Sequence, residues 1–217
     1  MRFETLKLCC DSQWQRIRHH DFVEAIGRGQ LTHSRFCYFV EQDAVYLRDF
    51  SRVLARLAVK APDSSTARIL LRHADTVFEV EQNLHQSLGE RLGMEPGRLG
   101  AGAAGAVTKA YQDHLVRTAD HGGFPAGIAA VLPCYWTYRA IGIELAGASL
   151  PKDPLLTDWI MTYAGDPYGK SVQEMIQIWE AEVLTPDQQE EAIAAYHWSM
   201  VYERLFWEQA WRLGVWE

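Results

Sequence analysis

The stretch Val131-Leu132-Pro133-Cys134-Tyr135-Trp136-Thr137-Tyr138-Arg139 decides how the rest of the chain is interpreted. Pro133 suits the first turn of a helix, where its missing N–H would have no partner in any case. Four residues then share one helical face: Cys134, Tyr138, Ile141 and Leu145. That face is apolar except for a thiol and a phenol. Cys134 is therefore either a small core residue, as free cysteines usually are, or a catalytic thiol.

The length of 217 residues is enough for one core, so we expect a single domain over residues 1–217. Hydrophobic residues make up 48% of the chain and aromatic residues 12%, which favours a core or pocket walled with rings. The formal net charge is −7 and no run of Lys or Arg stands out. This balance argues against nucleic acid or an anionic membrane surface as a partner.

The cysteines and the N-terminal residues indicate the compartment. The four cysteines are Cys9, Cys10, Cys37 and Cys134. They form no Cys-x-x-Cys pair and no pattern typical of a disulfide framework, so we expect a reducing compartment. Residues 1–14 lack the apolar block of a signal peptide, and no apolar run is long enough to span a bilayer. These features predict a cytoplasmic protein without a membrane partner.

Apolar residues recur at helical spacing along nearly the whole chain, with almost no strand-like alternation. Glycines, prolines and capping residues divide the chain into about eight helices. The main ones are expected from about Glu4 to His19, Asp21 to Ile26, Thr32 to Lys60, Ser64 to Gly93, Val107 to Asp120, Pro133 onward, Tyr168 to Leu184, and Thr185 to Leu213. The pattern predicts an all-α bundle.

Two carboxylates lie on otherwise apolar helix faces. The helical neighbours of Asp43 are Phe39, Val40, Tyr46 and Leu47, and those of Glu203 are Ser199, Met200, Phe206 and Trp207. Burying a carboxylate without partners costs free energy. Each carboxylate therefore belongs either to a structural hydrogen-bonded pair or to a functional site.

Other polar patterns are less specific. Glu81 and His85 are one turn apart and form a structural pair or a metal half-site, but the paired Glu-x-x-His motifs of di-iron bundles are absent. His114 and His121 are expected at the surface or in the last turn of a helix. Residues 100–105 match the letters of a dinucleotide fingerprint without the required preceding strand, so we expect a loop.

Several motifs, in order and over nearly the whole chain, resemble the TenA/thiaminase II family. Gln42-Asp43-x-x-Tyr46-Leu47 resembles its Gln-Asp-x-x-Tyr-Leu signature, and Pro133-Cys134-x-Trp136-x-Tyr138 resembles its catalytic cysteine motif. The later motifs are matched by Trp159-Ile160-x-x-Tyr163 and Glu203-x-x-Phe206-Trp207. His20-Asp21-Phe22, followed by Gly29-x-Leu31, matches the start, although the family commonly has His-Pro-Phe.

The resemblance implies a heme-oxygenase-like all-α fold, usually assembled as a homotetramer. It implies an aminopyrimidine aminohydrolase that releases 4-amino-5-hydroxymethyl-2-methylpyrimidine from an aminomethyl precursor or from thiamine. Cys134 places the chain with the cysteine-containing branch of the family. No metal or organic cofactor is expected, because the chemistry is covalent catalysis with an acid partner.

Roles carried over from the matching motifs make Cys134 the nucleophile and Glu203 the proton donor. Asp43 would hydrogen-bond the amino edge of the pyrimidine. The resemblance gives further substrate contacts or pocket walls to Tyr46, Tyr111, Tyr138, Tyr163 and Phe206. Aromatic walls with a few placed polar groups suit a flat ligand that has donors and acceptors on its edge.

Two other functions remain open at the level of the sequence. One is a binding protein on the same fold that keeps the pyrimidine pocket and has lost the chemistry. The other is a different heme-oxygenase-fold enzyme, of the pyrroloquinoline-quinone-synthase or di-iron kind. Activity that depends on iron or oxygen would favour this last enzyme over the aminohydrolase.

Overall fold

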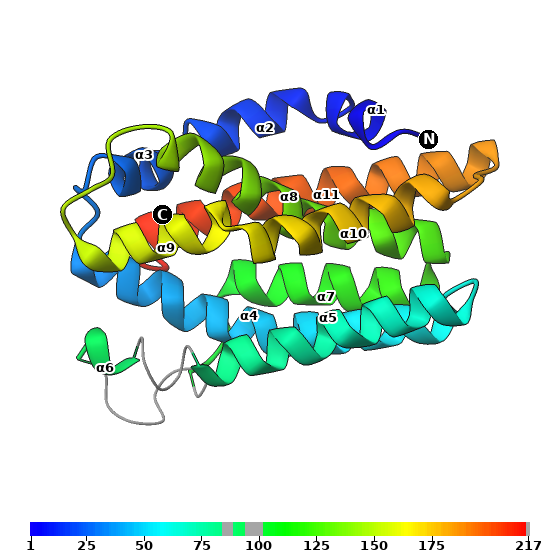
Figure 1. The fold of residues 1–217 in the computed structure, drawn as a ribbon, viewed down its shortest axis with the longest axis horizontal. Helices are drawn as coiled ribbons and strands as arrows, with labels where there is room; N and C mark the ends of the chain where they lie inside the picture. The colour runs from blue at the N-terminus through cyan, green and yellow to red at the C-terminus, as the bar shows by residue number, and fades with distance from the viewer. Residues whose placement is uncertain (84–88, 94–101, 216–217) are drawn as a thin grey trace.

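A computed structural model describes residues 1–83, 89–93 and 102–215 of the chain. Every regular element in this part is a helix, which confirms the predicted all-α fold (Figure 1). The helices are α1 (Phe3–Leu8), α2 (Asp11–Arg18), α3 (Asp21–Gly27), α4 (His33–Lys60), α5 (Ser64–Asn83), α6 (Gly89–Arg91), α7 (Ala106–His121), α8 (Phe124–Ala146), α9 (Pro154–Ala164), α10 (Asp166–Ala181) and α11 (Pro186–Trp211). They outnumber the eight or so expected, because the first helix is divided, α6 is a single turn, and α9 was not among the main helices expected.

The long helices run side by side as a bundle. Figure 1 shows α4, α5 and α7 on one side, α1 to α3 on the opposite side, and α8 to α11 between them. The central helix α8 packs against α7, α9, α10 and α11, while α4 packs against α5 and α7. Helix α8 is therefore surrounded by protein, as a helix that is apolar on all sides must be.

Helix α8 begins nine residues earlier than predicted. Pro125, and not Pro133, occupies its first turn, so the expectation that Pro133 starts this helix is wrong. The residues between the two prolines are apolar or Gly and all buried, which favours helix over a loop with unsatisfied backbone groups. A proline inside a helix costs about 3 kcal/mol. Burial of α8 on all sides outweighs that cost.

The N-terminal segment is two helices and not the single helix predicted from Glu4 to His19. Helix α1 ends at Leu8 and α2 begins at Asp11. The turn between them buries Cys10 in the core and leaves Cys9 exposed. The turn lets α1 pack against α10 while α2 packs against α8 and α11.

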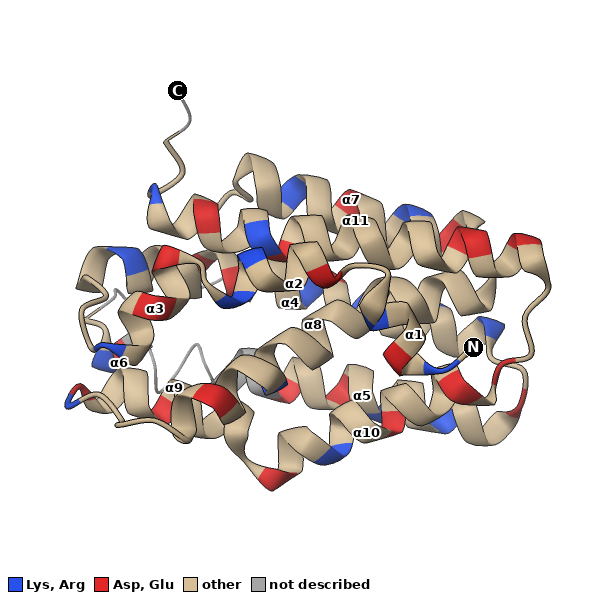
Figure 2. Ribbon diagram, turned by 90° about the horizontal axis from the view of Figure 1, so that it is seen from above, with Lys and Arg blue, Asp and Glu red and all other residues tan. Residues whose placement is uncertain are grey.

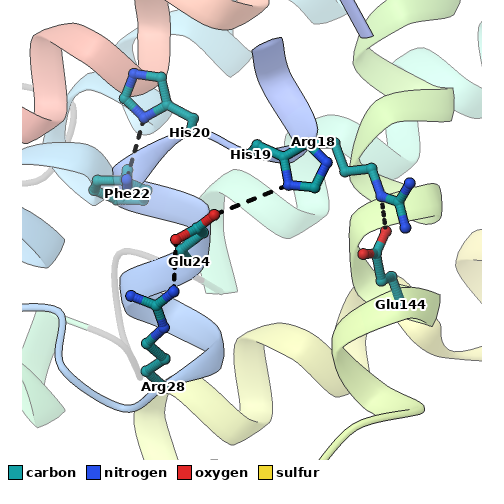
Figure 3. Close-up of polar contacts among 7 residues, drawn as sticks. All are labelled: Arg18, His19, His20, Phe22, Glu24, Arg28 and Glu144. Carbon is teal, nitrogen blue, oxygen red and sulfur yellow. Dashed lines mark hydrogen bonds and ion pairs between the residues drawn. The ribbon is translucent and has the colours of Figure 1, made fainter. Parts of the chain in front are cut away.

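The junction between α2 and α3 is fixed by polar contacts that Figure 3 draws. The His20 imidazole accepts a hydrogen bond from the backbone N–H of Phe22 at 3.1 Å and so caps α3. On its other side, His20 Nε2 lies 2.8 Å from Glu208 Oε2 of α11, so the contact is not only local. Arg18 pairs with Glu144 of α8 at 2.7 Å, which holds the end of α2 on the central helix.

The later helices start where the sequence places capping residues. Asp153 accepts a hydrogen bond from the N–H of Leu155 at the start of α9, with Pro154 in the first turn. Thr185 and Gln188 form a reciprocal capping box at the start of α11. These starts confirm the expected helix from Thr185 and fix the long helix that carries Glu203.

The charged residues of the chain are interspersed. Figure 2 shows Lys and Arg alternating with Asp and Glu along the helices. In the part of the chain that the structure describes, no helix combines the length and the apolar character needed to cross a membrane.

The close crossing of α8 and α9 gives a stability prediction. A Cβ at Gly142 would lie 2.8 Å from backbone atoms of Tyr163 and Ala164, whereas one at Gly147 would meet nothing closer than 3.4 Å. Gly142→Ala should lower the free energy of unfolding by about 1–3 kcal/mol through overpacking. The matched Gly147→Ala should change it by about 0.5 kcal/mol or less. Urea unfolding followed by circular dichroism measures both, and equal effects of the two variants would contradict the crossing.

Candidate active site

A pocket of about 320 Å³ opens between α4, α5, α8, α9 and α10. Its volume lies in the range of about 300–1,000 Å³ typical of small-molecule sites. Eight aromatic residues line the pocket: Phe36, Phe39, Phe50, Tyr135, Tyr138, Trp159, Tyr163 and Tyr168. The polar groups among them include Asp43, His73 and Cys134. The pocket therefore offers flat apolar surfaces and a small number of placed polar atoms.

Four of the predicted site residues lie on the pocket wall. They are Asp43 from α4, Cys134 and Tyr138 from α8, and Tyr163 from α9. The ring centroids of Tyr138 and Tyr163 are 4.9 Å apart. The structure thus brings together residues that are up to 120 positions apart in the sequence.

The other four predicted residues form a layer next to this wall. Glu203 is buried, and its Oε1 accepts a hydrogen bond from the Tyr111 hydroxyl at 2.7 Å. The Tyr46 ring lies 5.0 Å from that of Tyr111 and 5.8 Å from that of Phe206. Tyr46 and Tyr111 were expected to line the pocket, and the structure instead places them beside the buried carboxyl, outside the lining residues.

Burial sets the protonation of Glu203. It raises the pKa of the carboxyl to about 8, with a further increase from the nearby Asp43 and a decrease from the Tyr111 hydrogen bond. Glu203 is therefore largely protonated at neutral pH. Because Oε1 accepts from Tyr111, Oε2 is the atom left to carry the proton.

Asp43 is also shifted, by burial alone, which raises its pKa to about 7. None of the side chains in the described ranges donates a hydrogen bond to this carboxyl. A carboxyl at a pocket wall without a donor is a ready acceptor for a donor that a ligand brings.

The Cys134 thiol faces the pocket and is neutral at rest. Burial raises its pKa well above the usual value, and the charges of Glu203 and Asp43 raise it further, while the Tyr46 hydroxyl lowers it. That hydroxyl has no hydrogen-bond partner of good geometry among the described residues, although it lies close to the thiol and to Tyr111. Keeping Glu203 protonated removes one of the two charges that oppose the thiolate.

Several positioning contacts could not be found from sequence periodicity. The Arg139 guanidinium donates to the backbone oxygens of Tyr163 at 3.0 Å and Gly165 at 2.8 Å, which satisfies the end of α9 and fixes the Tyr163 ring. The Tyr168 hydroxyl donates to the Cys134 oxygen at 3.1 Å. These bonds tie α9 and α10 to the helix that carries the thiol.

Gln42, which precedes Asp43 in the predicted signature, has a structural role. Its Oε1 accepts from the backbone N–H of Gly105 at 2.8 Å and from Thr108 Oγ1 at 2.6 Å. Thr108 in turn accepts from Gln209 of α11 at 2.8 Å. This buried chain holds the start of α7, and therefore Tyr111, against the helices that carry Asp43 and Glu203.

Sequence reasoning missed two features of the pocket. His73 and Tyr135 both line it, and Arg91 pairs with Asp158 at 2.8 Å among its lining residues. A signal for His73 was present, since it lies four residues from Ile69 and four from Val77 on the apolar stripe of α5. A histidine at that spacing should have been a candidate for the buried face.

Three minor sequence expectations have different outcomes. His114 is half-buried, with Nε2 3.0 Å from Ser199 Oγ, so it is not the simple surface residue expected. The side chains of Glu81 and His85 lie outside the described residues, as do residues 100 and 101 of the glycine-rich segment, whereas residues 102–105 form neither helix nor strand, as expected.

Comparison with known proteins decides the family. A model of the TENA/THI-4/PQQC family matches residues 10–213. The chain belongs to this family. The "TenA homologue protein from P. horikoshii OT3" superposes with a TM-score of 0.90 at 26% identity, covering 98% of both chains, which confirms the heme-oxygenase-like fold expected for the family member.

Two curated relatives show how this family member compares in sequence. The "Aminopyrimidine aminohydrolase" of Halalkalibacterium halodurans is 32% identical over 94% of this chain and 92% of its own length. The "Thiamine biosynthesis multifunctional protein ThiED" of Corynebacterium efficiens is 37% identical over 89% of this chain. The match spans only 26% of that longer protein.

The raised pKa of Glu203 predicts a pH dependence of stability. The native state holds the Glu203 proton up to about pH 8, whereas an unfolded glutamate loses it near pH 4.5. The native state therefore binds more protons between these values, so its stability falls as pH rises through this window, by about 1.4 kcal/mol per unit of pKa difference. Glu203→Gln should remove this loss. The difference in free energy of unfolding between the variant and the wild type should therefore shift in favour of the variant from pH 5 to pH 8.

Thermal or urea unfolding at both pH values measures the effect. Glu190→Gln changes an exposed glutamate on the same helix and serves as the matched control. A Glu203→Gln protein whose stability varies with pH as the wild type does would show that the buried carboxyl is already ionised at pH 5.

Proposed function

We propose that this protein is an aminopyrimidine aminohydrolase of the thiaminase II kind, acting on 4-amino-5-aminomethyl-2-methylpyrimidine, on thiamine, or on both. The observation that carries the proposal is the arrangement of a thiol, Cys134, and a carboxyl of raised pKa, Asp43, on the wall of one aromatic pocket, with a second such carboxyl, Glu203, in the layer next to that wall. The printed names of the curated relatives support a hydrolase that breaks a C–N bond of an aminopyrimidine.

Binding follows from the shape and polarity of the pocket. The flat pyrimidine stacks among Tyr138, Tyr163 and Trp159, whose rings lie 4.8 to 6.1 Å apart. Its exocyclic amino group donates to Asp43, which otherwise has no donor in the described part of the site. A donor at this position favours the ionised carboxylate, so substrate binding lowers the pKa of Asp43.

Cys134 is the nucleophile in this proposal. The Cys134 sulfur adds to the electron-poor ring as the thiol proton passes to the amine, and the electron pair pushed out expels that protonated amine from the side-chain carbon. Glu203 protonates a ring nitrogen as charge builds there, which is the task of a carboxylic acid kept protonated at neutral pH. Water then adds to the side-chain carbon, and the thiolate leaves as the ring recovers its aromaticity.

The finer expectations remain part of the proposal. The substrate is the small-molecule partner, the reaction uses no metal or organic cofactor, and the chain acts as one domain in a cytoplasmic homotetramer. Among the residues with described side chains, no three His, Cys, Asp or Glu groups gather as ligands of a metal ion.

Turnover assays test the function directly. Purified protein is incubated with 4-amino-5-aminomethyl-2-methylpyrimidine and, separately, with thiamine, and the hydroxymethyl product is followed by chromatography. Cys134→Ala and Glu203→Gln should each reduce kcat by about a hundredfold or more, because each removes a group that acts on the reacting ring. The ratio of wild-type rates identifies the preferred substrate.

Two comparisons keep this test specific. Cys9→Ala removes an exposed thiol and should retain full activity. Wild-type activity in Cys134→Ala would reject the covalent mechanism, and tight binding of the hydroxymethylpyrimidine without any turnover would favour the binding-protein alternative.

A further inference from the structure

Three ionisable side chains from three helices form a continuous hydrogen-bonded chain beside Cys134. His73 of α5 lies with Nε2 2.7 Å from Glu174 Oε2 of α10 and with Nδ1 3.0 Å from the Tyr135 hydroxyl of α8. His73 and Tyr135 are buried and line the pocket, whereas 36% of the Glu174 side chain is exposed. The chain therefore leads from the pocket wall to the protein surface.

The charges on this chain fix the direction of its hydrogen bonds. Glu174 stays ionised, because bonds from His73 and Arg72 lower its pKa despite partial burial. Burial, more than any other cause, lowers the pKa of His73, so its ring is neutral and has one N–H. That N–H donates to the Glu174 carboxylate, which leaves Nδ1 to accept from Tyr135.

This direction leaves an acceptor in the pocket. The single proton of the Tyr135 hydroxyl is committed to His73, and no other group in the described residues bonds to its oxygen. The lone pairs of that oxygen are therefore available to a donor within the pocket. In this order, the carboxylate holds the imidazole in place, and the imidazole accepts the hydroxyl proton, which makes the hydroxyl oxygen more basic.

A purely structural tether would not require this arrangement. Arg72 already links α5 to α10 through an ion pair with Glu174 at 2.6 Å, at the surface. His73 adds a second link, which places a titratable ring at the pocket wall beside Tyr135, the residue after Cys134. Ionisable groups of perturbed pKa at the wall of a pocket are candidates for a functional role.

We propose that Tyr135, backed by His73 and Glu174, accepts the proton of the water that completes the hydrolysis. The inference rests on the proposed function, because it concerns the second half of that reaction. Tyr135 would be the residue that contacts the reacting water. His73 and Glu174 would act through it, as positioning and proton-accepting residues.

The step balances as follows. The water oxygen forms a bond to the exocyclic carbon that the amine has left, and one water O–H bond breaks. Its proton passes to the Tyr135 oxygen while the Tyr135 proton passes to His73, giving an imidazolium paired with the Glu174 carboxylate. The electron pair of the exocyclic double bond enters the ring, the C–S bond breaks, Cys134 leaves as thiolate, and the ring-nitrogen proton returns to Glu203.

The test separates amine release from product formation. Tyr135→Phe keeps the ring and removes only the hydroxyl, and His73→Gln removes the imidazole nitrogen that would take up the proton behind it. Both variants should release one equivalent of amine per site in a rapid burst and then form hydroxymethyl product about a hundredfold more slowly than wild type. The pyrimidine bound to Cys134 should accumulate and appear in the intact-protein mass.

Azide provides a second readout that a structural role would not change. It attacks as an anion and has no proton to lose, so it should restore turnover of the trapped intermediate in Tyr135→Phe. Arg52→Gln cuts an exposed ion pair with Asp49 that takes no part in this chain, and it should keep kcat within about twofold of wild type.

Several outcomes would overturn the proposal. Normal kcat in Tyr135→Phe, or slow turnover without a burst and without azide rescue, would show that the chain does not serve the water step. Slower alkylation of Cys134 by iodoacetamide in His73→Gln would assign the chain to the thiol instead. A wild-type protein that turns over neither substrate would reject the proposed function itself. That result is distinct from the outcomes above, which compare variants with an active wild type.

Discussion

The cost of burying carboxyl groups is the constraint on which the rest of this structure depends. Asp43 and Glu203 come from helices at opposite ends of the sequence and meet in a region from which aromatic rings exclude water. Removing water from a carboxyl penalises its charged form, so the pKa of each rises toward neutrality. Two ordinary side chains thereby become an acceptor that lacks a donor and an acid that keeps its proton.

The fold supplies the rigidity that this arrangement needs. Helix α8 is buried through the turns around Cys134, so the thiol cannot move away from the carboxyls without disturbing the core. Arg139 fixes the end of α9, and the chain from Gln42 through Thr108 to Gln209 fixes the start of α7. Polar contacts at helix ends therefore help to position Tyr163, which lines the pocket, and Tyr111, which donates to Glu203.

Local sequence rules predicted much of the fold, and they failed where contacts between residues distant in the sequence determine the structure. Helical periodicity and capping residues predicted the all-α class and the start of α11, because these depend on neighbours a few residues away. They misplaced the start of α8, since burial by four other helices compensates a proline inside it. They could not pair His73 with Glu174 or Tyr135, because no spacing rule links residues from three helices. Asp43 and Glu203 were found because a carboxylate among apolar neighbours breaks a local pattern.

The motif residues that carry the family resemblance divide into those that line the pocket and those that lie behind it. Each motif residue that lines the pocket has a chemical reason to be there, while Gln42 and Phe206 act through packing and hydrogen bonds behind it. A motif therefore mixes groups that contact a ligand with groups that hold them in place. Only the three-dimensional arrangement separates the two kinds.

The protonation state of the two carboxyls is the central claim, and carbon-13 NMR of their carboxyl carbons measures it most directly. The signals are assigned by their loss in Asp43→Asn and Glu203→Gln, and followed as a function of pH in the intact protein. The account predicts midpoints near pH 7 for Asp43 and near pH 8 for Glu203. Midpoints near about 4 for both, as in exposed carboxyls, would contradict it.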